Sequence, residues 1–367
     1  MNNFIFAVGA ILLAMGISAQ QQQNRNGLIT NPEEIEVLFL GETPAWRDIP
    51  IPKVPVPSGK PLKLGYHFKA DWILNPNINP NVYKGIDPVL QKDYNTSNAK
   101  TMTEEANWAG MNTNTSPGDP CMDVGPNHVV QMINATRVKI WNKSGAVVLA
   151  EQAFSTLAGT PSGGGDPIVL YDERADRWLL SEFASPPSSI LYIAISQTPD
   201  PTGAYNVYQF NLDAFPDYPH YSVWHDGYYV TANKFSGNTT YVMDRAAMIA
   251  GDPNPAIVGF NLPGVVNNNN TVFSPEPANL TGVDFPPGAP GYIVYLQDDG
   301  WGGGIANDHL KVWEISMDWN NPSNSSISQP FEIPTDPFDS VFAPFGTGDV
   351  AQPGTNQKID MIGGIIS

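Results

Sequence analysis

Cysteine is almost absent from this sequence. Among 367 residues there is only Cys121, so no disulfide within the chain can hold the fold together. Hydrophobic residues make up 41% of the chain, which is enough for a core and argues against wholesale disorder. The fold must therefore come from apolar burial, and Cys121 is either a free thiol or a partner for a cysteine outside this sequence.

Basic residues are also scarce. Lys and Arg number 18 against 36 Asp and Glu, which gives a formal net charge of −18. Nucleic acid binding requires clustered Lys and Arg, and an anionic membrane surface would repel so acidic a chain. We therefore expect no nucleic acid partner, whereas the acidity suits a cation or a neutral ligand.

Long apolar runs are missing except at the start of the chain. Residues 4–17 are apolar and lead to small residues, with a cleavage point after Ala19. The run is too short to span a membrane, and it predicts a signal peptide over residues 1–19, although "MNN" lacks the usual Lys or Arg. No cysteine follows the cut, so no lipid anchor is expected. We predict a secreted or outer-surface protein that uses a secretion machinery and has no membrane span.

Helical periodicity is nearly absent as well. Residues 20–110 carry prolines at positions 50, 52, 55, 57 and 61, which favour extended polyproline II structure. Only "NPEEIEVLFL" (31–40) has a weak helical pattern. We expect residues 20–110 to form a Pro- and Asn-rich leader to the main fold.

Residues 111–367 contain short β-type runs such as "ILYIAIS" and "LKVWEISM", separated by Gly, Pro, Asn and Asp. Such spacing predicts an all-β sandwich, barrel or propeller. An Asp followed closely by Pro recurs at intervals of 43 to 67 residues, at Asp123, Asp166, Asp217, Asp284 and Asp349. This period favours a β-propeller with about four blades and the start of a fifth. Because "QKIDMIGGIIS" ends inside a predicted strand, we expect the ring to be truncated at the C-terminal end.

Several of these segments resemble one group of large secreted bacterial proteins. They include "DVGPNHVVQMINATRVKIWNKSG", "DPIVLYDERADRWLLSEFA" and "FPDYPHYSVWHDGYYVTANKF". The group looks like sialidase-superfamily-type β-propellers of Bacteroidetes-like bacteria, which are often exported by type IX secretion. The resemblance covers roughly residues 108–367 and implies a propeller fold and an extracellular location. It implies no activity, since the group has no settled one.

Sialidase chemistry itself is disfavoured by the residues. Such enzymes clamp a sugar carboxylate with three arginines from different blades. The predicted propeller has only four arginines, two of which share one turn: Arg137, Arg174, Arg177 and Arg245. These arginines therefore give little support for a clamp that needs three guanidinium groups from different blades.

The stretch "DPIVLYDERADRWLLSEF" (166–183) places charged residues between two apolar runs. Two apolar runs joined by a short polar link predict a hairpin. A paired-carboxylate catalyst would need burial or close apposition, whereas a hairpin tip is hydrated. We therefore interpret residues 172–176 as a solvated turn rather than an active site.

The repeated aspartates are the better candidates. If each enters the innermost strand of a blade, the carboxylates converge on one rim, together with His128 and His220. A ring of carboxylates can bind Ca²⁺ or, with two at a suitable separation, hydrolyse a glycosidic bond. The leading alternative is structural, because Asp beside Pro forms turns by bonding its own backbone.

The loop "QDDGWGGGIANDH" (297–309) is a second candidate site. It offers oxygen ligands for calcium from Asp298, Asp299, Asn307 and Asp308, although their spacing matches no EF-hand. Trp301 could stack on a sugar face. A glycine-rich insertion without function is the equal alternative.

Taken together, these features predict an extracellular binding module for a glycan or another extracellular partner such as a protein, with calcium as the only cofactor considered. A carbohydrate-active hydrolase using the rim carboxylates is the alternative from another class. A structural scaffold within a larger surface protein is the third.

Overall fold

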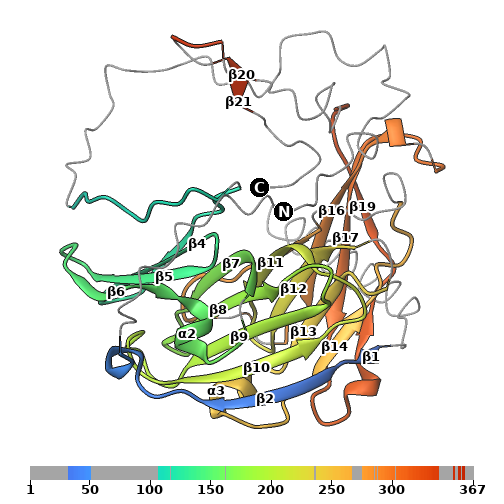
Figure 1. Cartoon of the computed structure of the whole chain (residues 1–367). Helices are drawn as coiled ribbons and strands as arrows, with labels where there is room; N and C mark the ends of the chain where they lie inside the picture. Colours follow the sequence, from blue (N-terminus) through green and yellow to red (C-terminus); the bar gives the residue numbers. More distant parts are fainter. Residues whose placement is uncertain are drawn as a thin grey trace, which may run out of the picture.

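The computed structural model describes residues 32–50, 106–115, 117–161, 163–234, 237–266, 275–284, 286, 288–301, 303–338, 350–351, 354–356 and 358–359. These residues form antiparallel sheets with only two short α-helices, α2 (Phe154–Ala158) and α3 (Arg245–Ala250) (Figure 1). The prediction of an all-β chain is confirmed. Within the described residues, no helix is long and apolar enough to cross a membrane.

The first sheet is a four-stranded meander in chain order. Its strands are β3 (Cys121–Val124), β4 (His128–Ile133), β5 (Arg137–Asn142) and β6 (Val147–Ala153). Short polar turns such as "NATR" and "NKSG" separate alternating apolar runs, a pattern that favours hairpins between neighbouring strands.

The second and third sheets repeat this meander and gain a fifth strand each. The second contains β7 (Gly163–Asp172), β8 (Arg177–Ala184), β9 (Ile190–Ser196) and β10 (Tyr205–Asn211), with β2 (Glu36–Glu42) added beside β10. The third contains β11 (Asp217–Val223), β12 (Tyr228–Asn233), β13 (Thr240–Met243) and β14 (Ile257–Phe260), with β1 (Glu33–Glu34) beside β14.

The fourth sheet begins with the short strand β15 (Glu276–Pro277). It continues through β16 (Gly291–Gln297) to β17 (His309–Ser316), which pairs with both β18 (Ser326–Ile327) and β19 (Phe331–Pro334). The remaining pair, β20 (Val350–Ala351) and β21 (Lys358–Ile359), forms a two-stranded sheet. Three 3-10 turns complete the described elements: η2 (Trp46–Asp48), η4 (Asp299–Trp301) and η5 (Pro322–Asn324).

Successive sheets meet through their first strands. β7 contacts β3 on one side and β11 on the other, and β11 contacts β15. Each sheet therefore presents its first strand inward and its last strand outward, an arrangement that is propeller-like (Figure 1).

The core lies in the layers between sheets. β8 shows how one strand serves two layers: Trp178 and Leu180 pack toward the first sheet, whereas Leu179 and Phe183 pack toward the third. A further layer joins the third sheet to the fourth around Trp313. Strands covered on both faces lose the polar alternation of a half-exposed strand, which explains the near-continuous apolar runs.

The weak helical pattern at residues 31–40 was misleading. β1 and β2 lie in this stretch and extend the outer edges of two sheets. Exposed side chains alternate along β2, as a strand at a sheet edge requires. η2 then anchors the segment, because the buried Trp46 stacks on Tyr205 with ring centroids 3.9 Å apart.

Candidate functional site

Three carboxylates lie where the innermost strands begin. Asp119 precedes β3, Asp166 lies near the start of β7, and Asp217 opens β11. Because these strands hold the same place in three successive sheets, their starts face one another. We call these three residues the inner-strand carboxylate cluster.

The electrostatics confirm that the cluster members are close. Burial raises the pKa of Asp166 to about 7, with further contributions from the charges of Asp217 and Asp119. Burial and the charge of Asp119 raise the pKa of Asp217 to about 6. Burial also raises the pKa of Asp119. Near neutral pH, one carboxyl group of the cluster therefore carries a proton for much of the time while another is mainly ionised.

One hydrogen bond between sheets and one within the first sheet hold the cluster in place. The backbone N–H of Tyr218 donates to Oδ2 of Asp166 over 3.1 Å, and Nδ2 of Asn134 donates to Oδ2 of Asp119 over 2.5 Å. The pairing register shifts near the start of both β7 and β11. Such bulges are enriched next to active sites because they redirect side chains.

The backbone at the cluster adopts left-handed conformations. The φ angles are +37° at Asp119, +46° at Asp166 and +50° at Tyr218. Each costs on the order of 1–3 kcal/mol in a residue other than glycine, and such strain concentrates at functional sites. Asp176, in the turn before β8, has a similar φ of +54°, so this conformation by itself does not distinguish a ligand site from a turn.

A histidine and a fourth acidic group lie beside the cluster. Nδ1 of His220 on β11 is 3.1 Å from Oε1 of Glu276 on β15. The ring of Tyr218 packs edge-on against His220, with centroids 4.5 Å apart. The pKa of Tyr218 is raised by burial and then by the charges of Glu276, Asp119 and Asp166. Four sheets thus contribute polar groups to one region.

The predicted set of aspartates is brought together only in part. Asp166 and Asp217 lie in the cluster, with His220 next to them. Asp123 lies further along β3, where its Oδ2 accepts the backbone N–H of Tyr171 over 2.6 Å and so ties β3 to β7. Asp284 is exposed in a loop.

Two further predicted positions lie elsewhere. His128 opens β4, after the turn that follows β3, and therefore lies at the opposite end of the sheet from Asp119. It lies instead near Asp200. Partial burial raises the pKa of Asp200, but hydrogen bonds from Thr202 and then the charges of Arg47 and His128 lower it below its usual value. Asp349 lies outside the described residues.

Asp119 was missed by the sequence analysis, although the sequence contains a pattern that could have found it. Gly118-Asp119-Pro120 repeats the triplet Gly165-Asp166-Pro167, and both precede or begin an innermost strand. The triplet is not decisive by itself, because a third copy at 251–253 lies in the loop after α3. Glu276 carries no such pattern.

The interpretation of residues 172–176 as a solvated turn was wrong for its first residue. Asp172 is 1% exposed. Its carboxylate accepts Nε and Nη2 of Arg245 over 2.6 and 2.8 Å and the Tyr228 hydroxyl over 2.9 Å. Glu173 is exposed as expected. The hairpin tip thus begins with a buried ion pair between the second and third sheets.

Arginines of the predicted propeller are engaged outside the cluster. Arg137 pairs with Glu151, and Arg245 pairs with Asp172. Nη1 of Arg177 donates to backbone carbonyls of its own turn. These three guanidinium groups are therefore not arranged as a clamp at the cluster.

The acidic loop brings three of its four predicted ligands together. Carboxylate oxygens of Asp298, Asp299 and Asp308 lie within 4.8 Å of one another. Asp308 also accepts the backbone N–H of Asp299 over 2.7 Å, while Asn307 is exposed and offers its carbonyl to His309. Oxygen donors of this kind suit Ca²⁺.

Trp301, the predicted sugar-stacking residue, contacts a strand of the fourth sheet. It is half-buried and packs at 45° to Tyr295, with ring centroids 5.8 Å apart. Its backbone N–H donates to the Asp298 carbonyl, which closes the 3-10 turn η4. The indole therefore supports the loop that carries the three aspartates.

Comparisons with known proteins add little. No family model and no curated protein matches this sequence. Among solved structures, the chain is similar to the catalytic domain of a GH62 α-L-arabinofuranosidase from Coprinopsis cinerea, with a TM-score of 0.30, 9% identity, and coverage of 53% of this chain and 63% of that one.

Two further structures are similar to the same degree. One is a putative exo-β-1,3-galactanase from Bifidobacterium bifidum S17, with a TM-score of 0.29, 11% identity, and coverage of 59% of this chain and 88% of that one. The other is an endo-1,5-α-L-arabinanase from Thermotoga petrophila RKU-1, with a TM-score of 0.28, 15% identity, and coverage of 56% of this chain and 52% of that one. The match spans less than two thirds of the first and third of these chains. TM-scores this low carry no conclusion about activity.

Proposed function

We propose that this protein is a secreted, extracellular β-propeller that binds a glycan at the inner-strand carboxylate cluster. The observation that carries the proposal is the convergence of Asp119, Asp166 and Asp217 from three sheets, with raised pKa values. Perturbed acidic groups in one place are typical of functional sites.

The chemistry of the cluster suits a neutral, hydroxyl-rich ligand. Ionised carboxylates accept hydrogen bonds from sugar hydroxyls, and a protonated carboxyl can also donate one. His220 and Tyr218 add a polar ring and a flat aromatic surface beside them. An anionic ligand would be repelled by the cluster and by the acidic chain as a whole.

A second candidate function, glycoside hydrolysis, is favoured by the meeting of two buried carboxyl groups, Asp166 and Asp217, whose pKa values are both raised mainly by burial. Asp166, with a pKa of about 7, can supply a proton to a leaving group at neutral pH. Asp217, with a pKa of about 6, is then mainly ionised and can act as base or nucleophile. Environments that separate two carboxyl pKa values are how such sites divide acid from base.

One assay separates the two functions. The protein is incubated with a panel of extracellular polysaccharides, and both retention on the polymer and release of sugar are measured. If it binds without hydrolysis, Asp166→Asn and Asp217→Asn reduce retention at least tenfold. If it hydrolyses, release appears and each variant lowers the rate by about 10²–10⁴-fold.

The matched control is Asp284→Asn, which changes an exposed aspartate of the same repeated pattern. It should retain the behaviour of the unmodified protein in both measurements. Loss of retention with Asp284→Asn, or full retention and release with Asp166→Asn, would contradict a role for the cluster.

The assignment of the sheets to propeller blades is also part of what we propose. The four described meanders are blades, and β20 and β21 begin a fifth that follows the last repeated aspartate, Asp349. Export by a bacterial secretion machinery, with the type IX route as the specific candidate, is supported by the apolar start of the chain and the resemblance of residues 108–367.

Calcium assistance is proposed for the acidic loop. The pKa of Asp299 is raised by burial and then by the charges of Asp308 and Asp298, so a cation would relieve repulsion. A saturating concentration of Ca²⁺ should raise the Tm by roughly 5 °C. Asp299→Asn should remove most of that shift, while Asp252→Asn in an exposed loop should preserve it. An equal shift in both variants would exclude the loop as the calcium site.

A further inference from the structure

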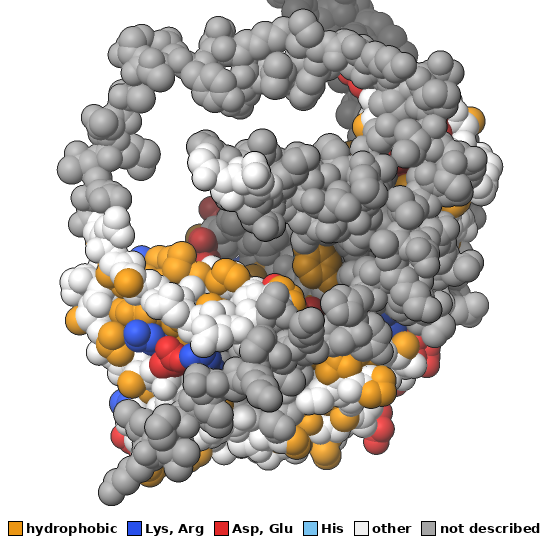
Figure 2. Space-filling view, turned by 45° about the horizontal axis from the view of Figure 1, so that its top comes forward, with side chains coloured by type: hydrophobic (Ala, Val, Ile, Leu, Met, Phe, Trp, Pro, Cys, Tyr) orange, Lys and Arg blue, Asp and Glu red, His pale blue; other side chains and the backbone are white. Residues whose placement is uncertain are grey.

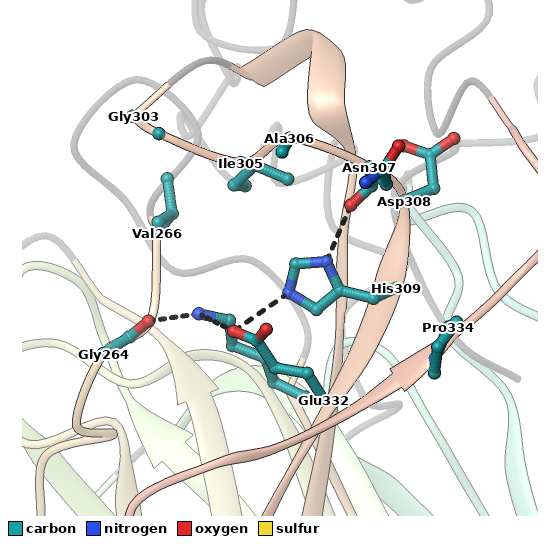
Figure 3. A pocket seen from close by; sticks show the side chains of 12 residues that line it. Gly264, Val266, Gly303, Ile305, Ala306, Asn307, Asp308, His309, Glu332 and Pro334 are labelled. Atoms are coloured by element: carbon teal, nitrogen blue, oxygen red, sulfur yellow. Dashed lines mark hydrogen bonds and ion pairs between the residues drawn. The ribbon is translucent and has the colours of Figure 1, made fainter.

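A pocket of about 480 Å³ lies on the outer part of the fourth sheet and shares no residue with the inner-strand carboxylate cluster. It is bounded by Gly264 and Val266, by residues 303–308 and by side chains of β17 and β19 (Figure 3). Its volume falls within the range of small-ligand sites, which are mostly apolar with a few placed polar groups.

The polar groups of this outer pocket form one connected row (Figure 3). Nζ of Lys311 donates to the carbonyl of Gly264 over 2.5 Å and lies 3.3 Å from Oε1 of Glu332. The same carboxylate oxygen is 3.5 Å from Nε2 of His309, whose Nδ1 is held by the Asn307 carbonyl at 2.8 Å. Lysine, carboxylate and imidazole are thus positioned by the fold before any ligand arrives.

The apolar wall is equally well fixed. Backbone groups of Val266 pair with the buried side-chain amide of Gln297, through bonds of 2.8 and 3.0 Å. Gly303 closes against Val266: a Cβ at that glycine would lie 2.6 Å from Cγ1 of the valine. Ile305, Ala306 and Pro334 complete the lining.

The charges in the outer pocket select for a neutral ligand. Lys311 is only 8% exposed in its side chain and is already balanced by Glu332, so neither charge needs a counter-ion from a ligand. Asp308 also lines the pocket, but its two oxygens accept backbone N–H groups of Asp299 and Phe338. A charged ligand would have to break the Lys311–Glu332 pair, whereas a neutral one can add bonds to it.

We propose that the outer pocket is a second binding site, for one neutral sugar residue. Glu332 is 57% exposed and can accept from ligand hydroxyls, and the ammonium of Lys311 has three donors, of which the carbonyl and carboxylate contacts use two. The carbon-rich side of a pyranose ring packs on Val266, Ile305 and Pro334. The site stands on its own geometry and does not depend on what the cluster does.

Calorimetric titration with sugars that share a pyranose ring but differ in charge tests this proposal. The probes are glucose, galactose and mannose, each compared with its uronate and its amino-sugar counterpart. At least one neutral sugar should bind, at least tenfold more tightly than its charged counterparts. Glu332→Ala should weaken that binding about tenfold or more, because it removes charge-assisted hydrogen bonds.

Three variants separate the outer pocket from other effects. Gly303→Ala should weaken binding through the displaced Val266 wall. Glu314→Gln, on β17 but outside the lining, should leave binding unchanged. The binding component that Glu332→Ala removes should persist in Asp166→Asn, so failure of the cluster and failure of this pocket are distinguishable. Absence of binding by every neutral sugar, tighter binding of a charged sugar, or insensitivity to Glu332→Ala would overturn the proposal.

Discussion

Arg245→Leu is expected to lower the free energy of unfolding by about 3–5 kcal/mol, because it leaves the buried carboxylate of Asp172 without its counter-charge. The guanidinium group binds both oxygens of Asp172 and lies over the ring of Tyr228. The Tyr228 hydroxyl would remain as a hydrogen-bond donor, but it carries no charge. The pair joins the start of α3 to the turn between β7 and β8, so its loss loosens the contact between two sheets.

The control for this prediction is an exposed ion pair of similar length. Nη1 of Arg47 lies 2.8 Å from Oδ2 of Asp200, and the two side chains are 52% and 44% exposed. Arg47→Leu should cost at most about 1 kcal/mol, because solvent screens the pair. Denaturant titration of both variants measures the difference. Equal costs would show that Asp172 is solvated after all.

Glu182→Gln is expected to abolish most of a large pH dependence of stability. Glu182 on β8 is 0% exposed and lies between the first and second sheets, with neither oxygen in a hydrogen bond of normal geometry. Burial raises its pKa to about 8, against which the nearby Thr136 hydroxyl favours the charged form only weakly. Gly163 packs directly on the carboxylate, since a Cβ there would lie 1.7 Å from Oε2.

The sign of the effect follows from proton binding. A carboxyl group with a pKa near 4.5 when unfolded and about 8 when folded binds more protons in the native state between these values. Its contribution is therefore fully present below pH 4.5 and is lost as the pH rises to about 8. The loss amounts to roughly 3–5 kcal/mol. Asp166 and Asp217 act in the same direction over a narrower window.

Chemical denaturation at a series of pH values tests this prediction. The slope of stability against pH between 5 and 8 should be clearly smaller in Glu182→Gln than in the unmodified protein. Glu173→Gln, which changes an exposed residue of the preceding turn, should leave the slope unchanged. An unaltered slope in Glu182→Gln would mean that the carboxylate is hydrated or paired in solution.

The general architecture was predictable because it depends on local patterns. Alternating and continuous apolar runs with short polar turns predict antiparallel hairpins, and the structure contains them in chain order. On the described part of the face in Figure 2, basic and acidic side chains are both sparse and lie among hydrophobic ones. The edge strands β1 and β2 escaped prediction, since their pairing partners lie more than 160 residues away.

The sites were predictable only where a local motif happened to coincide with a long-range contact. Asp166 and Asp217 are marked by a neighbouring proline and do approach each other, whereas Asp123 has the same mark and binds the backbone of β7 instead. Asp119 takes the place expected of Asp123, because the chain enters β3 four residues earlier than the repeat suggested.

The sequence by itself determined an acidic, all-β chain built from hairpins and without an internal disulfide, since composition and short-range periodicity are properties of neighbouring residues. Only the tertiary structure decided which charged groups are buried. Asp172 and Glu182 lie in one hairpin and both are buried, yet one is paired with Arg245 and the other is left without a hydrogen bond. Burial and pairing depend on which sheets pack together, and that information is held in contacts between residues far apart in the chain.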